Sequence, residues 1–275
     1  MVFVLKANGE KTRFDKKKII GTCLRSGLSK DKAEQIASEV ESKVRDGMRT
    51  RDILRMVLQR LDALEAGHGG KYRLKEAIAD LNPEFHEFEK YIAHVFKAHG
   101  YKTKWDQIIQ GDIIEHQADV LLEKDGKHYI VECKHHRNPH RMTGLDIPLT
   151  YWAILDDIQK GHESGKIKTY YDNMWVITNT KFSMHAIKYA KGKNLILSGW
   201  AQPKENDLRE LIDSKSVYPL TLLGLDEQTL AKLSNANFIL INDIITANER
   251  YVQKLTKLPY RKVQDIVNKA KQILV

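Results

Sequence analysis

The residues Ala118–Lys134 read ADVLLEKDGKHYIVECK, which is the pattern of a β-hairpin. The pair Asp125-Gly126 suits a two-residue type I′ turn, in which both central residues need a positive φ. The segments on either side are rich in Val, Ile, Leu and Tyr, which strands favour. Counting outward from the turn pairs Asp119 with Glu132. Because side chains alternate along a strand, Lys134 falls on the same face as Glu132, and we expect two carboxylates and an amine to meet at one end of the hairpin.

This grouping of charges predicts a metal site that acts on phosphodiesters. Two carboxylates side by side are unfavourable unless a cation lies between them. They can hold a hard divalent cation such as Mg²⁺ or Mn²⁺, which prefers oxygen ligands. Such an ion polarises a phosphodiester and activates water, and a nearby lysine can orient that water or stabilise the developing charge. The alternative is an ordinary exposed hairpin with charged outer positions, but the opposed acids and the apolar arm before Glu132 favour the site.

The hairpin and the segment before it resemble the PD-(D/E)XK nuclease superfamily, in particular its Mrr-like and archaeal Holliday-junction-resolvase-like restriction endonuclease domains. The matching segments are FEKYIAHVFKAHGY, ADV and VECK, at Phe88–Tyr101, Ala118–Val120 and Val131–Lys134. The resemblance implies that Asp119 and Glu132 hold the metal and that Lys134 is the catalytic lysine. It also implies hydrolysis of DNA as the reaction.

A helix is expected over Glu84–His99, where apolar residues recur on one face. The resemblance implies that an acid on this helix completes the metal site, and it indicates Glu89. Glu84 and Glu87 are rival candidates for that acid. Ala118 stands where the superfamily's proline precedes the aspartate, a departure that leaves the role of the following aspartate intact.

Composition and charge agree with a globular protein that has a polyanionic partner. The chain has 275 residues, of which 42% are hydrophobic and 29% charged, and its net charge is +9. A basic balance favours nucleic acid as a partner, although a lysine-rich proteome gives the same balance. Cys23 and Cys133 lie far apart and no CxxC occurs, which argues against a disulfide framework or a zinc ribbon. No apolar run reaches membrane-spanning length and no signal peptide is recognisable, so we expect a cytoplasmic protein without a membrane partner.

We expect an α/β protein of three domains, with boundaries at 1–81, 82–204 and 205–275. The first domain combines a β-hairpin with a small bundle of helices. The central domain is a restriction-endonuclease-like α/β/α sheet, in which Trp175–Trp200 has the strand, helix and strand of a right-handed βαβ crossover. The third is a small all-α domain.

The C-terminal sequence LTKLPYRKVQDIVNKA has the shape of one half of a helix-hairpin-helix motif. Such a turn offers backbone N–H groups to a DNA phosphate. Tyr260 and Arg261 stand where glycines would allow that approach, so the motif would be degenerate. The alternative is a purely structural helical cap.

The N-terminal sequence VLKANGEKTRFDKKKI, at Val4–Ile19, resembles the start of the ATP-cone domain, a module that binds ATP or dATP as an allosteric effector. Lysines can pair with the phosphates and branched apolar side chains can cover the base, and the resemblance adds Asp15 and Thr50 near the base or ribose. Six residues are therefore expected to contact the nucleotide: Val4, Lys6, Asp15, Lys18, Ile19 and Thr50. Thr12 and Leu54 depart from the family. The alternatives are a solvated lysine-rich helix start and a bundle that serves only in oligomerisation.

A basic run, His135-His136-Arg137-Asn138-Pro139-His140-Arg141, follows the lysine of the hairpin. Its spacing suits no standard tetrahedral metal site. We expect a loop at the edge of the active site in which His135, His136, Arg137 and Arg141 contact DNA phosphate. A plain exposed loop is the alternative.

Together these features predict a Mg²⁺-dependent DNA endonuclease with a regulatory ATP- or dATP-binding domain. The alternative is a nucleotide-responsive DNA-binding regulator that does not cleave. Double-strand cutting with one site per chain would suggest a homodimer.

Overall fold

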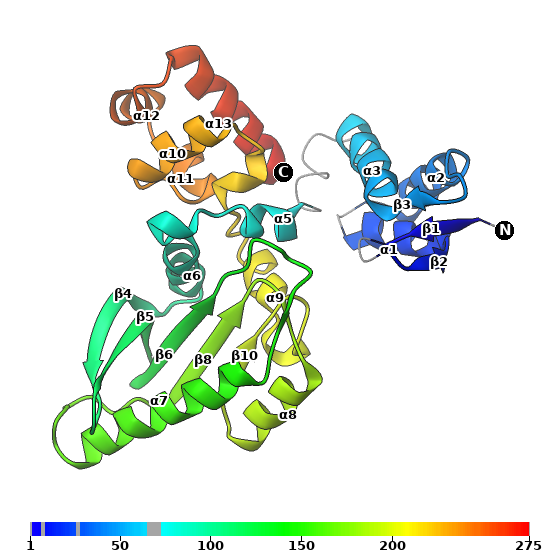
Figure 1. Ribbon diagram of the computed structural model, residues 1–275. Coiled ribbons are helices and arrows are strands. Elements are labelled where there is room, and N and C mark those ends of the chain that lie inside the picture. The colour runs from blue at the N-terminus through cyan, green and yellow to red at the C-terminus, as the bar shows by residue number, and fades with distance from the viewer. Residues whose placement is uncertain (1, 7–8, 26–27, 65–72, 275) are drawn as a thin grey trace. The chain divides into compact units, whose positions relative to one another are not determined.

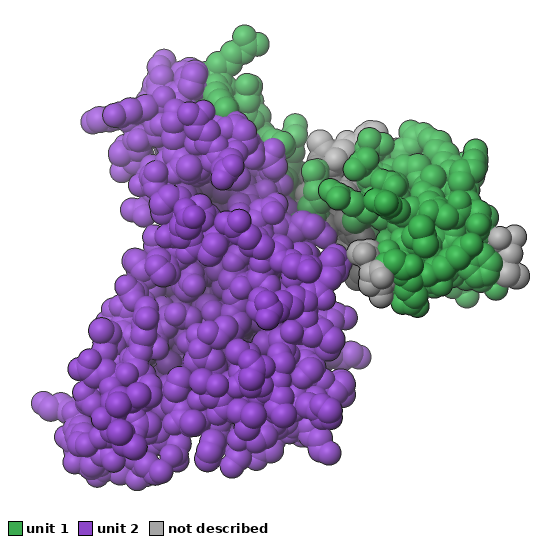
Figure 2. Space-filling view, in the orientation of Figure 1, with its two compact units in different colours: residues 1–74, 261–275 green, residues 75–260 purple. Residues whose placement is uncertain are grey.

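The computed structural model describes all residues except 1, 7–8, 26–27, 65–72 and 275 (Figure 1). The chain forms two compact units, one made of residues 1–74 and 261–275 and the other of residues 75–260 (Figure 2). This division differs from the three expected domains, because the central region and most of the C-terminal helices share one unit. Each unit is described by itself.

The first unit begins with the expected hairpin, here β1 (Phe3–Leu5) and β2 (Lys11–Arg13). A third strand that the sequence did not predict, β3 (Met48–Arg49), pairs in parallel with β1 and gives the order β2-β1-β3. The expected helices follow as α1 (Lys16–Arg25), α2 (Lys30–Glu41) and α3 (Thr50–Leu64). The sequence predicts a break at Gly67–Gly70, where glycines interrupt the helical pattern, and these residues lie outside the described ones. It also predicts a helix over Tyr72–Asp80, where the structure has α5 (Leu74–Ala79), most of which belongs to the second unit.

A single core holds these strands and helices together. On α2 the buried residues recur at helical spacing and form one apolar face. They meet residues of β1, α1 and α3 in a cluster that includes Val4, Ile19, Cys23, Ile36, Val40, Ile53, Val57 and Leu61.

The second unit is built on a five-stranded mixed sheet with the order β10-β8-β6-β5-β4. Its strands are β4 (Lys102–Gln110), β5 (Glu115–Lys124), β6 (Lys127–Lys134), β8 (Asn173–Thr178) and β10 (Ile196–Ser198). The first three strands are antiparallel, and β6, β8 and β10 run parallel. Asp125 and Gly126 have φ angles of 53° and 76°, as the turn requires. Glu123 pairs with His128 and so confirms the predicted register.

Helices cover both faces of this sheet (Figure 1). On one face, α6 (Glu87–Ala98) packs on β4, β5 and β6, and the Phe96 ring meets Trp175 of β8 edge to face at 4.7 Å. On the other face, α7 (Asp146–Glu163) and α8 (Met184–Gly192) enclose a core with Ile130, Leu155 and Val176. The expected βαβ crossover is present, because β8 and β10 are parallel and α8 connects them. Two short strands, β7 (Met142–Thr143) and β9 (Lys181–Phe182), pair outside the sheet.

Small helices complete the chain, as expected for residues 205–275. They are η2 (Lys204–Asn206), α9 (Leu208–Asp213), η3 (Leu220–Leu223), α10 (Glu227–Asn235), α11 (Ile241–Thr246), α12 (Glu249–Thr256) and α13 (Tyr260–Leu274). Long-range hydrogen bonds anchor the start of this region, since the Tyr91 hydroxyl donates to the Val217 carbonyl at 2.7 Å and the Thr221 hydroxyl to Ala77 at 2.6 Å. Among the described helices, none is both long and apolar enough to span a bilayer.

Candidate active site

Asp119 lies at a break in the sheet. The β5–β6 ladder ends with the pair Val120–Val131, one residue before Asp119. On the other side, Asp106 of β4 has a left-handed φ of 52° and is left out of the β4–β5 ladder. The Asp119 carboxylate Oδ2 instead accepts a hydrogen bond from the Cys133 backbone N–H at 2.7 Å. The irregular backbone therefore turns this carboxylate toward β6 and fixes its position.

Glu132 and Lys134 meet on the face of the sheet that α7 covers. The Lys134 ammonium Nζ lies 2.7 Å from Glu132 Oε1. The Tyr151 hydroxyl of α7 donates to the same oxygen at 2.5 Å, and Nζ also lies 5.0 Å from the centre of the Tyr151 ring. Within the described residues nothing donates to the second oxygen, Glu132 Oε2. Both donors thus orient the carboxylate and leave one oxygen available to a ligand.

Burial shifts the pKa values of all three groups. Burial, and next the charge of Asp119, raise the pKa of Glu132 to about 7, while Lys134 and Tyr151 offset part of that shift. Burial also raises the pKa of Asp119, against the effect of the Cys133 N–H. For Lys134 burial works in the opposite sense, but the hydrogen bonds with Glu132 and Tyr151 outweigh it and raise the pKa. The amine therefore stays protonated at neutral pH, beside carboxylates that ionise reluctantly.

Of the three candidate acids before β4, Glu89 lies near this cluster, since the charges of Asp119 and Lys134 both affect its pKa. Glu84 is exposed in the single-turn helix η1 (Pro83–Phe85), and Glu87 Oε2 accepts the Asn82 backbone N–H at 2.7 Å. The Oε2 atom of Glu89 is buried and has no hydrogen-bond partner among the described residues. Burial and then the charge of Asp119 raise the Glu89 pKa. Leaving such an oxygen without a partner is costly, which makes Glu89 a candidate ligand for a cation.

The oxygen ligands that these carboxylates offer suit a hard divalent cation. Asp119, Glu132 and Glu89 supply only oxygen atoms, and each has a pKa raised by burial that a cation would bring back down. In the described part of the chain, no three His, Cys, Asp or Glu side chains stand ready in a metal-binding arrangement. A cation would therefore have to draw these carboxylates together.

Asp119 and Glu132, but not Glu89, line a cavity of about 180 Å³. Its lining consists of His116, Gln117, Asp119, Glu132, Tyr151 and Ile154. His116 is held by Asp157, with 2.7 Å between Nε2 and Oδ2. Sequence reasoning missed both His116 and Tyr151. His116 stands three residues before the aspartate and could have been noticed, whereas Tyr151 reaches the site only through the packing of α7 on the sheet.

The two histidines after Lys134 are used inside the protein. The His135 ring stacks on Phe88 at 5.0 Å between centroids, and its Nε2 lies 2.9 Å from the Ile78 carbonyl oxygen. Burial lowers the pKa of His135, so the ring is neutral at pH 7. This arrangement ties β6 to α6 and α5, and a phosphate contact by this ring stays a prediction.

His136 is fixed by its backbone. Its N–H donates to Asn179 Oδ1 at 2.8 Å, and Asn179 Nδ2 donates back to the His136 carbonyl at 2.7 Å. Asn179 is fully buried, which agrees with loop capping as its main task. Arg137 and Arg141 are exposed, and their contact with a DNA phosphate stays a prediction.

The residues expected to bind a nucleotide fall into two groups. Val4 and Ile19 are 4% and 7% exposed and belong to the core of the first unit. Lys6 pairs with Glu10 at 3.0 Å. Asp15 accepts the Lys17 backbone N–H at 3.0 Å and caps α1.

Lys18 is exposed, and Thr50 is half-buried at the first residue of α3. The polar members of the set are thus accessible, and the apolar members are packed. Nucleotide binding by these residues stays a prediction.

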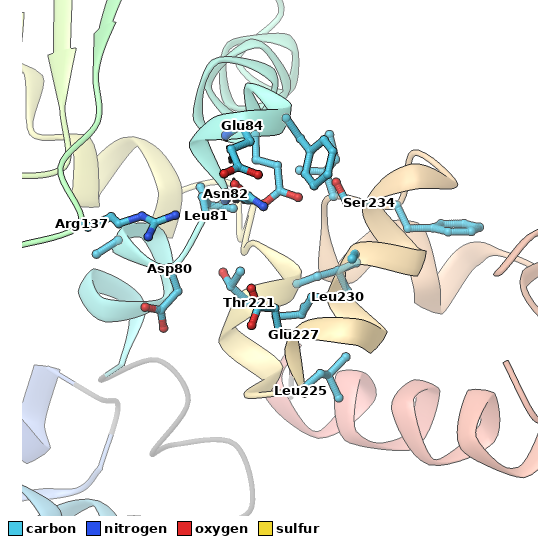
Figure 3. Close-up of a pocket in the computed structure, with 17 residues that line it drawn as sticks. Asp80, Leu81, Asn82, Glu84, Arg137, Thr221, Leu225, Glu227, Leu230 and Ser234 are labelled. Carbon is cyan, nitrogen blue, oxygen red and sulfur yellow. Dashed lines mark hydrogen bonds between the residues drawn. The ribbon is translucent and has the colours of Figure 1, made fainter.

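A larger cavity of about 590 Å³ lies elsewhere in the second unit, between η1 and α10 (Figure 3). Asp80, Glu84 and Glu227 stand around it, with Arg137 as the one basic residue of its lining. Its apolar part includes leucines of α10 and of the loop before η1. None of its residues belongs to the acid cluster, and its net negative charge disfavours a phosphate ligand.

Comparison with known proteins agrees with this geometry. Residues 81–146 match the restriction endonuclease family Mrr_cat, and residues 218–274 match the family described as AF1548-like, C-terminal. An uncharacterized protein of Archaeoglobus fulgidus is 32% identical over 183 residues, which cover 66% of this chain and 99% of that protein. Neither family match reaches residues 1–80.

Solved structures give the same relationship. The crystal structure of AF1548, described as a protein of unknown function, is 31% identical, covers 69% of this chain and 98% of its own, and superposes with a TM-score of 0.59. Can2 from Sulfobacillus thermosulfidooxidans, solved with cyclic tetra-adenylate, is 12% identical over 75% of this chain and 64% of its own, with a TM-score of 0.34, too low to support an argument. The chain therefore belongs to the AF1548-like family, and it carries a restriction endonuclease-like domain.

Proposed function

We propose that this protein is a Mg²⁺-dependent DNA endonuclease that hydrolyses phosphodiester bonds at the acid cluster of β5, β6 and α6. The observation that carries the proposal is the meeting of Asp119, Glu132 and Lys134 at one end of a hairpin within a restriction endonuclease-like domain. Glu89 supports it, because its buried Oε2 has no hydrogen-bond partner in the part of the chain that the structure describes.

Asp119, Glu132 and Glu89 would hold the Mg²⁺ or Mn²⁺ ion. When bound, such an ion supplies a Lewis acid for the scissile phosphate and lowers the pKa of a bound water. The Cys133 N–H fixes Asp119, and the Tyr151 hydroxyl fixes Glu132, so both carboxylates are oriented before a ligand arrives. Preorganised groups of this kind do not have to be reorganised during the reaction.

Lys134 supplies the positive charge that the reaction needs on the protein side. Its ammonium stays protonated at neutral pH because Glu132 and Tyr151 raise its pKa. It can donate a hydrogen bond to a phosphate oxygen on which negative charge develops, or hold the attacking water in line. Its position over the Tyr151 ring restricts where the amine can reach.

The direct test is cleavage of plasmid DNA with Mg²⁺ and with EDTA. The wild-type chain should cut only with the metal, and Asp119→Ala should not cut while still binding DNA. A wild-type chain that binds DNA but never cuts it would favour the non-cleaving regulator. The products would also show whether one strand or two are cut. Cutting of both strands would suggest a homodimer, and the mass of the protein in solution should then be measured.

The first unit is proposed to bind ATP or dATP as an effector. The hairpin, the Asp15 cap and the helix order that carry the ATP-cone resemblance are all present. Calorimetry with ATP and dATP should show heat that the pair of changes Lys6→Ala and Lys18→Ala abolishes. Lys43→Ala, an exposed lysine of the same unit, is the matched control. No heat with either nucleotide would favour a bundle that serves only in oligomerisation.

A further inference from the structure

Three isoleucines stand out from the surface beside the acid cluster. Ile108, Ile113 and Ile114 are 72%, 81% and 58% exposed, and we call them the isoleucine ridge. Ile108 belongs to β4, and the other two lie in the turn between β4 and β5. Holding large apolar side chains in water is unfavourable, and clustered ones usually mark a binding surface.

The turn that carries the ridge is rigid. One carboxylate of α7, that of Asp157, accepts the backbone N–H of Ile113 at 3.0 Å and that of Ile114 at 3.5 Å. The Asp157 carbonyl accepts the Asp112 N–H at 2.9 Å, and the Gly111 N–H closes the turn on the Ile114 carbonyl at 2.8 Å. These bonds hold the apolar side chains outward, so they cannot fold back onto the protein.

Two glycines let the turn sit directly on α7. A Cβ at Gly111 would lie 2.0 Å from Asp157 Oδ2, and one at Gly161 would lie 2.8 Å from the backbone carbon of Gly111. The ion pair between Lys166 and Asp112, at 2.9 Å, fastens the tip of the turn from the end of the helix. The backbone of the turn is therefore held from several sides.

The turn of the ridge reaches the active-site cavity through His116, two residues after Ile114. Ile108 pairs with Gln117 in the β4–β5 ladder, and both face away from the core under α7, in which Ile109 and Ala118 are buried. Gln117 and His116 line the cavity that also contains Asp119. Asp157 holds His116 with the same carboxylate that holds the turn.

We propose that the isoleucine ridge is an apolar wedge that enters the base stack of DNA and selects substrates with unpaired or distorted bases next to the cut. This inference rests on the proposed nuclease function and names its substrate class. Apolar side chains of this kind insert between base steps in proteins that kink DNA, and the insertion costs free energy because the bases are unstacked. The cost is smallest where bases are already unpaired, so a rigid wedge favours such DNA over a perfect duplex.

The test compares binding to two DNA probes in EDTA, where cleavage is excluded. One probe is a perfect duplex, and the other is the same duplex with a short unpaired bulge that carries 2-aminopurine. Wild type should bind the bulged probe at least about fivefold more tightly and change the fluorescence of the reporter base, because no paired bases have to be unstacked there. The pair of changes Ile113→Ala and Ile114→Ala should bind both probes equally.

Controls separate the wedge from other effects. Met184→Ala removes an apolar side chain that is 75% exposed on α8 and should keep the wild-type preference. Ile113→Lys should tighten binding to both probes and lose the preference. Wild type that does not distinguish the probes, or an alanine pair that still does, would overturn the wedge.

The alternative partner of the ridge is a second copy of this chain, and sedimentation of the same variants tests for it. Wild type and the alanine pair should have the same mass in solution. A dimer that the alanine pair converts into monomers would make the ridge an interface between copies and would contradict the inference. Binding is measured without metal, so it does not depend on cleavage. A protein that prefers the bulged probe but does not cut DNA would contradict the proposed nuclease function and leave the wedge proposal standing.

Discussion

Glu132 and His135 lie three residues apart, and the structure treats them in opposite ways. The imidazole of His135 stacks on Phe88 and lies within hydrogen-bond distance of the Ile78 carbonyl, so its partners are all internal. Glu132 keeps one oxygen without a donor among the described residues, and burial, together with the charge of Asp119, raises its pKa to about 7. The comparison teaches that residue type alone does not mark a functional group. What marks it is a polar atom that the fold has buried and left incompletely satisfied.

The largest expected effect comes from the positive charge of the cluster. Lys134→Ala should reduce cleavage by about 10²–10³-fold, because the chain loses the group that stabilises charge developing on the phosphate. The measurement is the single-turnover rate on plasmid DNA. Lys193→Ala is the matched control, since that lysine also lies over an aromatic ring, 3.9 Å from the centre of Trp152. Equal losses in both variants would mean that Lys134 acts only through stability or general DNA affinity.

The raised pKa of Glu132 gives a prediction for stability. A carboxyl group with a folded pKa of about 7 and an ordinary value of 4.5 stabilises the fold fully below pH 4.5 and loses that contribution as the pH rises through 7. Between pH 5 and pH 8 the free energy of unfolding of wild type should therefore fall by up to about 3 kcal/mol relative to that of Glu132→Gln, as measured by urea unfolding in EDTA. Added Mg²⁺ should restore wild type at pH 8 and leave the variant unchanged. A difference between the two proteins that does not vary with pH would show that Glu132 is not desolvated.

Changes to the residues that hold the basic run should alter the stability of the protein and not the rate of cleavage. Asn179→Ala removes a fully buried amide that bonds both the N–H and the carbonyl of His136. We expect a loss of about 2 kcal/mol in the free energy of unfolding, because two backbone groups lose their partner. Asn138→Ala removes an exposed amide that caps the His140 N–H and should change stability by less than about 1 kcal/mol. Similar losses in the two variants would contradict the structural role of Asn179.

The smallest expected effect comes from Tyr151. Tyr151→Phe removes the hydroxyl that donates to Glu132 Oε1 and leaves the ring under Lys134. Cleavage should fall by about tenfold, as expected for the loss of one hydrogen bond of about 1.4 kcal/mol. Because the hydroxyl also lowers the pKa of Glu132, the acid limb of the pH–rate profile should move to higher pH. Tyr170→Phe, in an exposed tyrosine, should leave both rate and profile unchanged.

The hairpin could be predicted from sequence because local chemistry determines it. Asp125 and Gly126 set the turn, and the period of two then carries the register along both strands. The meeting of Glu132 and Lys134 follows from that count. The break at Asp119 does not follow from it, because the break depends on the left-handed residue Asp106 of the neighbouring strand.

Other parts of the site depend on tertiary structure. A continuous helix was expected through Glu84, but His86 takes a φ of 51° and ends η1 before α6 begins. That turn gives the three nearby glutamates different surroundings and makes Glu89 distinguishable from Glu84. The Tyr151 hydroxyl and the Asp157 carboxylate reach β6 and the β4–β5 turn from α7, which no local pattern shows.

The most direct test of the central claim is anomalous diffraction from crystals of the full chain soaked in Mn²⁺. We expect one strong peak bound by the Asp119 and Glu132 carboxylates, with Glu89 nearby, and its loss in Asp119→Asn. A chain that cleaves DNA with Mn²⁺ while the crystals show no peak at these carboxylates would contradict it.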